Sequence, residues 1–141
     1  MRSVFFIFEE KEKKTVTNLL DCLCDESFFI KNDDKQWNII SGKGALYIYI
    51  YPAEELFAEI ENEDKTYFYK LNSMNHPLLN CQIDISGRFD GTIEVKNLLT
   101  QLLESVNGYA MDDYTGYFWS SEQIKNGSLV EGHPFFDYKG W

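Results

Sequence analysis

Apolar residues repeat along the chain with two different periods, and these periods predict the elements of a folded domain. Residues 3–8 form an unbroken apolar run, which is typical of a strand buried on both faces and central in its sheet. Residues 45–51 alternate strictly, with tyrosines on one face of the strand and aliphatic side chains on the other. Further strands are predicted over residues 36–41, 66–71, 79–85 and 109–111.

Two longer segments carry apolar residues at helical spacing. Residues 12–25 place leucine, valine and cysteine on one side, which predicts an amphipathic helix. A second helix opens near Glu94, carries a stripe of leucine and valine, and ends before Gly108, because glycine commonly terminates helices. A short third helix is predicted over residues 122–125, where a preceding serine can cap the first turn.

An acidic segment interrupts this pattern after residue 51. Pro52 followed by two glutamates fits the start of a helix, whereas residues 56–61 fit an edge strand equally well, and the sequence does not decide between them. The segment is either a solvated face or a surface that meets cations, because like charges repel unless water or a cation compensates them. Its six carboxylates belong to Glu54, Glu55, Glu59, Glu61, Glu63 and Asp64.

The order of these elements predicts an α+β fold. It reads strand–helix–strand–strand, the acidic insertion, further strand, and then strand–helix–strand. This order predicts a ferredoxin-like sheet with helices packed on one face and a C-terminal tail that packs back on the body. The length of 141 residues falls within the usual range of one domain, so residues 1–141 are expected to form a single domain.

The net charge of −10, from 13 basic and 23 acidic side chains, narrows the choice of partner. Such a chain repels phosphate backbones and anionic bilayers, so neither a nucleic acid nor a membrane is an expected partner. A basic protein is favoured, because opposite charges speed the encounter and set its orientation. The alternative is that the acidic surface serves only solubility.

The spacing of the cysteines and the N-terminal residues bear on the cellular compartment of the protein. Two of the three cysteines stand two positions apart on a predicted helix, a spacing that fits neither a disulfide framework nor a zinc site. The apolar run that ends at Phe8 is too short for a secretory signal, and no stretch approaches the roughly 20 apolar residues of a membrane helix. A cytoplasmic location is expected.

Few residues suggest catalytic chemistry. His76 and His133 each precede a proline in a predicted loop and belong to no metal or triad motif, so no metal and no cofactor are expected. The pair Asp112 and Asp113 allows three roles: turn residues, the acid and base of a small hydrolase, or part of a binding face. Aromatic residues that often anchor interfaces surround the pair, namely Tyr114, Tyr117 and Trp119.

One set of residues resembles a known family. The strand at residues 79–86, the leucine-striped helix and the segment Gly108–Ile124 are similar to those of small bacterial immunity proteins, including partners of contact-dependent growth inhibition and polymorphic toxins. In that family a strand–helix–strand unit ends in an Asp-Asp turn and a helix that begins near a Trp-Ser pair. The resemblance covers residues 36–51 and 79–125, which is under half the chain.

The resemblance implies a cytoplasmic toxin antagonist without enzymatic activity, whose partner is the C-terminal domain of a cognate toxin. The charge suggests a basic toxin such as a nuclease, blocked at its active site or substrate cleft. An adaptor or regulator unrelated to toxins, and a small hydrolase that uses Asp112 and Asp113, remain as alternatives. The expected partner-binding residues are the six carboxylates of residues 54–64, together with Asp112, Asp113, Tyr114, Tyr117 and Trp119.

Overall fold

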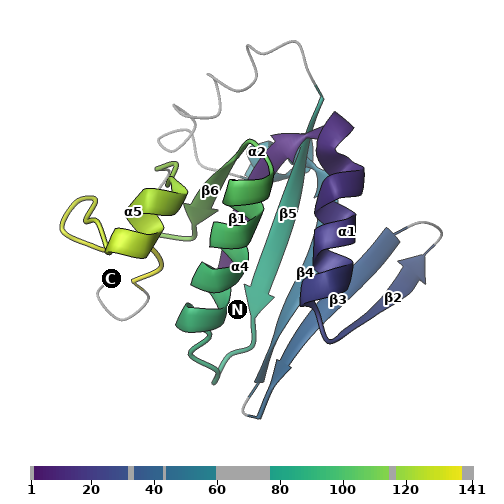
Figure 1. Cartoon of the computed structure of the whole chain (residues 1–141), viewed down its shortest axis with the longest axis horizontal. Coiled ribbons are helices and arrows are strands. Elements are labelled where there is room, and N and C mark those ends of the chain that lie inside the picture. The colour runs from purple at the N-terminus through teal and green to yellow at the C-terminus, as the bar shows by residue number, and fades with distance from the viewer. Residues whose placement is uncertain (1, 32–33, 43, 60–76, 115–116, 138–141) are drawn as a thin grey trace.

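The protein is α+β and is built on one antiparallel sheet of six strands (Figure 1). The computed structural model describes residues 2–31, 34–42, 44–59, 77–114 and 117–137. The sheet order is β2-β3-β4-β5-β1-β6. The strands are β1 (Arg2–Glu9), β2 (Glu26–Lys31), β3 (Asp34–Ser41), β4 (Gly44–Pro52), β5 (Leu78–Ile85) and β6 (Gly108–Asp112). The helices are the 3-10 turn η1 (Glu10–Glu12), α1 (Lys13–Leu23), α2 (Ala53–Glu59), α4 (Thr92–Ser105) and α5 (Ser121–Asn126).

The strand order differs from the ferredoxin-like sheet that the sequence predicts. β1 is central, as its apolar run indicates, and pairs with β5 on one side and β6 on the other. Beyond β4 the sheet continues through β3 to β2, and β2 has no counterpart among the predicted strands. Every residue of β2 is exposed, so its sequence shows no burial pattern, and only its pairing with β3 identifies it as a strand.

Helices α1 and α4 cover one face of the sheet, here called the helix face (Figure 1). Their apolar stripes meet the inward side chains of the central strands in one continuous core, which is the main source of stability. The largest fully buried side chains of this core include Phe6, Phe8, Ile83 and Leu99. The predicted spacing of both helices is confirmed, although α1 ends at Leu23, two residues earlier than predicted.

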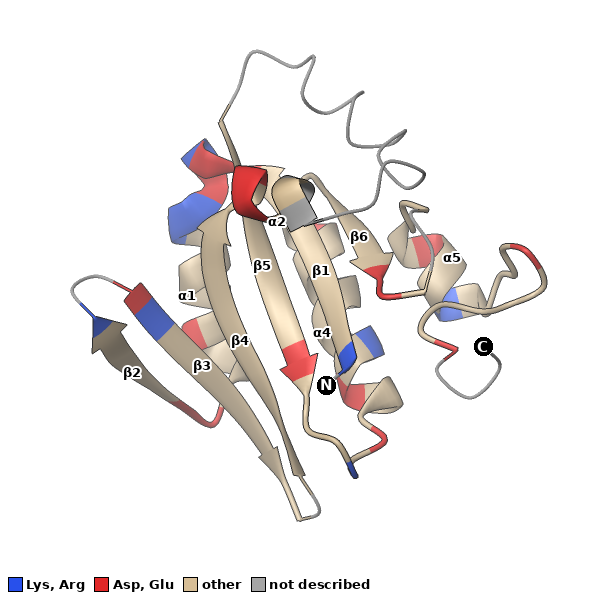
Figure 2. Cartoon of the chain, turned by 180° about the vertical axis from the view of Figure 1, so that it is seen from behind, with Lys and Arg blue, Asp and Glu red and all other residues tan. Residues whose placement is uncertain are grey.

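Helix α2 lies on the opposite face of the sheet (Figure 2). Ala53 and Leu56 are buried there against Phe5, Ile7 and Met111, which form a second, smaller core cluster. The prediction that all helices share one face is therefore wrong for α2, because β1 is apolar on both faces and its second face also needs a cover. The acidic segment begins as a helix rather than an edge strand.

The C-terminal residues up to 137, where the described part of the chain ends, pack on the body as predicted. Helix α5 starts with a reciprocal capping box between Ser120 and Gln123, and Gly127 ends it in the left-handed conformation. Phe135 and Phe136 are both buried in the main core. None of the helices described is long and apolar enough to cross a bilayer. The strand predicted over residues 66–71 lies outside the described residues.

Candidate protein-binding surface

Asp112 and Asp113 differ sharply in exposure. Asp112 is 2% exposed, and its carboxylate accepts hydrogen bonds from the main-chain N–H groups of Tyr114 (3.1 Å) and Phe136 (2.9 Å). Asp113 is exposed, and its Oδ2 accepts the N–H of Ser3 at 2.8 Å. Both carboxylates thus hold main chain from distant parts of the sequence together. The expectation of two exposed acids holds for Asp113 alone.

The burial of this pair bears on its possible role in acid–base catalysis. Although Asp113 is exposed as a whole residue, burial of its carboxyl group raises its pKa, and the nearby carboxylates of Asp112 and Asp84 add to this effect. The N–H of Ser3 acts in the opposite direction. A general acid or base needs contact with substrate, which the burial of Asp112 prevents.

The three predicted aromatic residues mainly anchor the C-terminal segment. Trp119 is 2% exposed, and its ring meets those of Tyr117 (5.4 Å) and Phe135 (5.5 Å) edge-on. Tyr117 is half-buried and accepts a hydrogen bond from Gln123 at 2.9 Å. Tyr114 is half-buried, with its ring 6.0 Å from that of Phe136. Trp119 therefore lies inside the fold, whereas partner binding by the two tyrosines stays a prediction.

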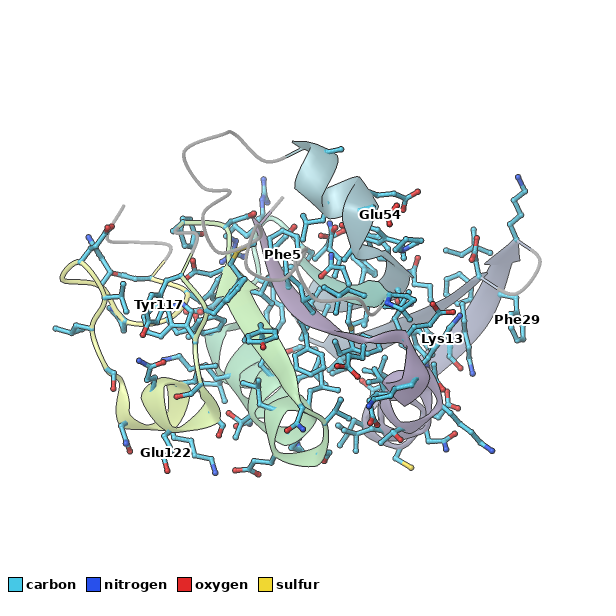
Figure 3. All side chains as sticks on the ribbon, turned by 90° about the horizontal axis from the view of Figure 1, so that it is seen from above. Phe5, Lys13, Phe29, Glu54, Tyr117 and Glu122 are labelled. Carbon is cyan, nitrogen blue, oxygen red and sulfur yellow. The ribbon has the colours of Figure 1, made fainter. Side chains whose placement is uncertain are left out.

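The acidic segment is only partly described. Glu54 and Glu55 are exposed in the first turn of α2, and Figure 3 shows Glu54 on the far side of the sheet from α1 and α4. Glu59 is the last residue of that helix. The predicted binding residues Glu61, Glu63 and Asp64 lie outside the described residues. Two of the six predicted carboxylates thus lie on the same side of the sheet as the tyrosines of β4.

A group of tyrosine and polar side chains lies on the α2 side of the sheet. The alternation of β4 directs its three tyrosines away from α1 and α4, because successive side chains of a strand point to opposite faces. Antiparallel pairing sets Asp84 of β5 opposite Tyr47 and Gln82 opposite Tyr49. We call the five residues Tyr47, Tyr49, Tyr51, Gln82 and Asp84 the tyrosine patch. All five are half-buried.

Hydrogen bonds order the side chains of the tyrosine patch. Asp84 accepts from the hydroxyl of Tyr49 (3.0 Å), the amide of Gln82 (2.8 Å) and the hydroxyl of Ser3 (2.6 Å). Tyr51 donates to Gln82 at 2.5 Å and stacks on Tyr49 with a ring separation of 5.8 Å. All three donors to Asp84 are neutral. Within the described part of the chain no Lys, Arg or His forms an ion pair with this carboxylate.

The surroundings of the patch are hollowed and carry charged side chains. A hollow of about 840 Å³ adjoins Tyr49 and Tyr51, and its lining includes Glu55 of α2 and both Asp34 and Lys35 of β3. Figure 2 shows acidic residues on this side of the molecule in α2 and near the ends of β5 and β6. A partner that presents Lys or Arg could therefore meet rigid aromatic rings and carboxylates on one surface.

Two of the three thiols, by contrast, are poorly suited to nucleophilic chemistry. Cys81 is fully buried in the core, and burial raises its pKa well above the ordinary value. Burial also raises the pKa of Cys24 to about 12. A thiol is reactive as the thiolate, so both groups are inert at neutral pH. This agrees with the packing role that the helical spacing indicates for Cys24.

Comparison with known proteins does not indicate a function for this chain. No protein-family model, no curated protein and no solved structure matches the chain. The tyrosine patch and the charge of the chain are the features that bear on function.

Proposed function

We propose that the protein is an immunity protein that binds a cognate bacterial toxin and keeps it inactive. The toxin is a basic nuclease domain, and the tyrosine patch covers its substrate cleft. The observation that carries this proposal is the arrangement of the patch, in which Asp84 lies opposite Tyr47, accepts from Tyr49 and has neutral donors only. The sequence resemblance to immunity proteins points in the same direction.

The composition of the patch suits a protein partner. Tyrosine is enriched among residues that dominate binding energy, because its ring offers a large contact area at a small cost in side-chain entropy. The hydrogen bonds among Tyr49, Tyr51, Gln82 and Asp84 hold these side chains in place before binding. Little further ordering is then needed when a partner arrives, which favours tight association.

The charges of the patch suit a basic partner. Asp84 carries a negative charge that no described cation neutralises, so a partner's Lys or Arg can form a charge-assisted hydrogen bond with it. Glu54 and Glu55 extend the acidic surface along α2, and Asp113 extends it past Ser3. A nuclease cleft is lined with cations that bind phosphates, so carboxylates on this surface can occupy the places of those phosphates.

The proposal is tested by the gene that adjoins the one for this protein. We expect it to encode a toxin whose C-terminal domain arrests growth, and we expect co-expression of this protein to restore growth. Purified toxin domain should bind with a dissociation constant on the order of nanomolar or tighter, as in other tight inhibitory complexes.

Two variants make the test specific to the surface. The double variant Tyr49→Ala with Asp84→Ala should lose protection, whereas Ile93→Ala, at an exposed position of α4 on the opposite side, should protect fully. Absence of a toxin gene beside this one, or full protection by the double variant, would overturn the proposal.

A further inference from the structure

The two edge strands of the sheet differ in whether other main chain pairs with their outer side. At the β6 edge, the N–H of Trp119 donates to the carbonyl of Ala110 at 2.8 Å, so the C-terminal segment covers part of that strand. At the other edge, β2 pairs with β3, and within the described residues nothing pairs with its outer side. An uncovered edge strand presents a row of main-chain donors and acceptors to another strand.

The exposed side chains of β2 are unusually apolar for such an edge. Phe28, Phe29 and Ile30 are 47%, 66% and 60% exposed. Figure 3 shows Phe29 at one end of the molecule, far from Tyr117 at the other. Soluble proteins commonly protect an edge with inward charges, proline or a bulge. These three consecutive positions carry neither charge nor proline, and the pairing with β3 shifts its register between Phe29 and Lys31. The edge is thus chemically suited to being covered by another strand.

We propose that β2 pairs with β2 of a second copy of this chain, so that two sheets join into one. The strand is self-complementary in the antiparallel direction. Opposite residues must point to the same face, so a register centred on Phe29 sets this residue against its own copy and Phe28 against Ile30 of the second copy. All three exposed apolar side chains then meet apolar side chains.

The charges at the ends of β2 favour the same arrangement. The strand follows Asp25 and begins at Glu26, and it ends at Lys31. In the register centred on Phe29, Lys31 lies opposite Ser27 of the second copy, one position from Glu26, so unlike charges come near each other at both ends of the pair. A basic partner has no such preference for β2, because the two ends of the strand carry opposite charges.

The dimer should be weak and should strengthen with salt. A six-residue edge buries less than the roughly 800 Å² per partner of a standard interface, so association is expected at high protein concentration. Each copy carries a net charge of −10, and salt screens the repulsion between two such chains. Salt should weaken the binding of a basic toxin, because it screens the attraction between opposite charges. The dimer can therefore fail its test while the proposed function passes, and the reverse.

Sedimentation velocity of the purified protein tests the dimer without any toxin. From about 5 µM to about 1 mM we expect a reversible monomer–dimer equilibrium with a larger dimer fraction at about 500 mM salt than at about 50 mM. Phe29→Lys should raise the dissociation constant at least about tenfold, because two lysines would then face each other. Leu129→Lys, at a position 65% exposed in the C-terminal segment, should leave it unchanged.

A crosslink tests the register. In a Cys22→Ser background, Phe29→Cys should form a disulfide-linked dimer on mild oxidation, because residue 29 faces its own copy, whereas Ser27→Cys should not. A monomer under all these conditions, or a dimer that Phe29→Lys does not weaken, would overturn the proposal. So would equal crosslinking at positions 27 and 29.

Discussion

At the scale of single residues, polar side chains connect distant parts of the chain. Asp112 holds the main chain at Phe136, and Asp113 holds the main chain at Ser3. Asp21 accepts from Lys35 at 2.8 Å and from the indole of Trp37 at 2.7 Å, so it fixes α1 to β3. Individual carboxylates should therefore contribute measurably to the free energy of unfolding. Whether each contribution rises or falls with pH follows from the surroundings of the carboxylate.

Replacement of Asp112 should destabilise the fold strongly. Asp112→Ala leaves the N–H groups of Tyr114 and Phe136 without their acceptor, at a cost of about 1–3 kcal/mol for a buried donor. Urea unfolding followed by circular dichroism measures this loss. The exposed Asn97→Ala on α4 should change the free energy of unfolding by less than about 0.5 kcal/mol. A midpoint for Asp112→Ala equal to that of the wild type would show that the two contacts carry no energy.

Asp113 and Asp21 should affect the pH dependence of stability in opposite directions. The pKa of Asp113 is raised in the folded state, chiefly by burial, so its ionisation destabilises the fold as pH rises. Asp113→Asn keeps an acceptor for Ser3 and cannot ionise. It should match the wild type near pH 3, below the ordinary carboxyl pKa, and exceed its stability at pH 7.

Asp21 supplies the matched comparison. Hydrogen bonds from Lys35 and then Trp37 lower its pKa, so its contribution is present at pH 7 and is lost as pH falls through the lowered pKa. Asp21→Asn should therefore be less stable than the wild type at pH 7 and closer to it in acid. Unfolding curves at several pH values would contradict this account if both variants shifted stability in the same direction.

At the scale of elements, the spacing of apolar residues predicts those helices and strands that bury their own apolar side chains. The stripes of α1 and α4 and the apolar run of β1 are correctly identified, because each buries its own apolar residues. The β2 strand is missed, since its exposed residues form a strand only through pairing with β3. The tyrosine alternation of β4 is visible in the sequence, but its partners Gln82 and Asp84 come from a strand about 30 residues away.

The burial of Asp112 and Trp119 could not be predicted for the same reason. Asp112 is buried because Phe136, 24 residues later, returns to donate its N–H. Trp119 is buried because its ring meets Phe135, which also belongs to the returning C-terminal segment. Both residues lie in a local sequence that is equally compatible with an exposed turn.

Strand β6 depends on a close approach at its first residue. A Cβ at Gly108 would lie 2.6 Å from the ring of Phe6 and 2.7 Å from the carbonyl oxygen of Ile7, and that oxygen belongs to main chain that cannot move aside. Gly108→Ala should lower the free energy of unfolding by about 1–3 kcal/mol. Gly42→Ala, where nothing lies within 4 Å, should be close to neutral. Chemical denaturation compares the two, and equal midpoints would show that β6 tolerates the added group.

At the scale of the whole molecule, the charge of −10 should govern the approach of a toxin. Stopped-flow association with the toxin domain should slow as salt rises, because salt screens the attraction. The double variant Glu54→Gln with Glu55→Gln should associate more slowly at low salt and show a flatter salt dependence, with little change in dissociation. An association rate that is independent of salt would mean that the acidic surface serves solubility alone.

The central claim is that the tyrosine patch, rather than Tyr114 and Tyr117, forms the toxin-binding surface. Isothermal titration calorimetry of the toxin domain with single variants tests it most directly. Tyr49→Ala should weaken binding about 30-fold, or about 2 kcal/mol, while Tyr117→Ala should remain within about threefold of the wild type. Both variants should first be shown to be folded by circular dichroism. Wild-type affinity for Tyr49→Ala together with a large loss for Tyr117→Ala would contradict the account and place the interface at Tyr117.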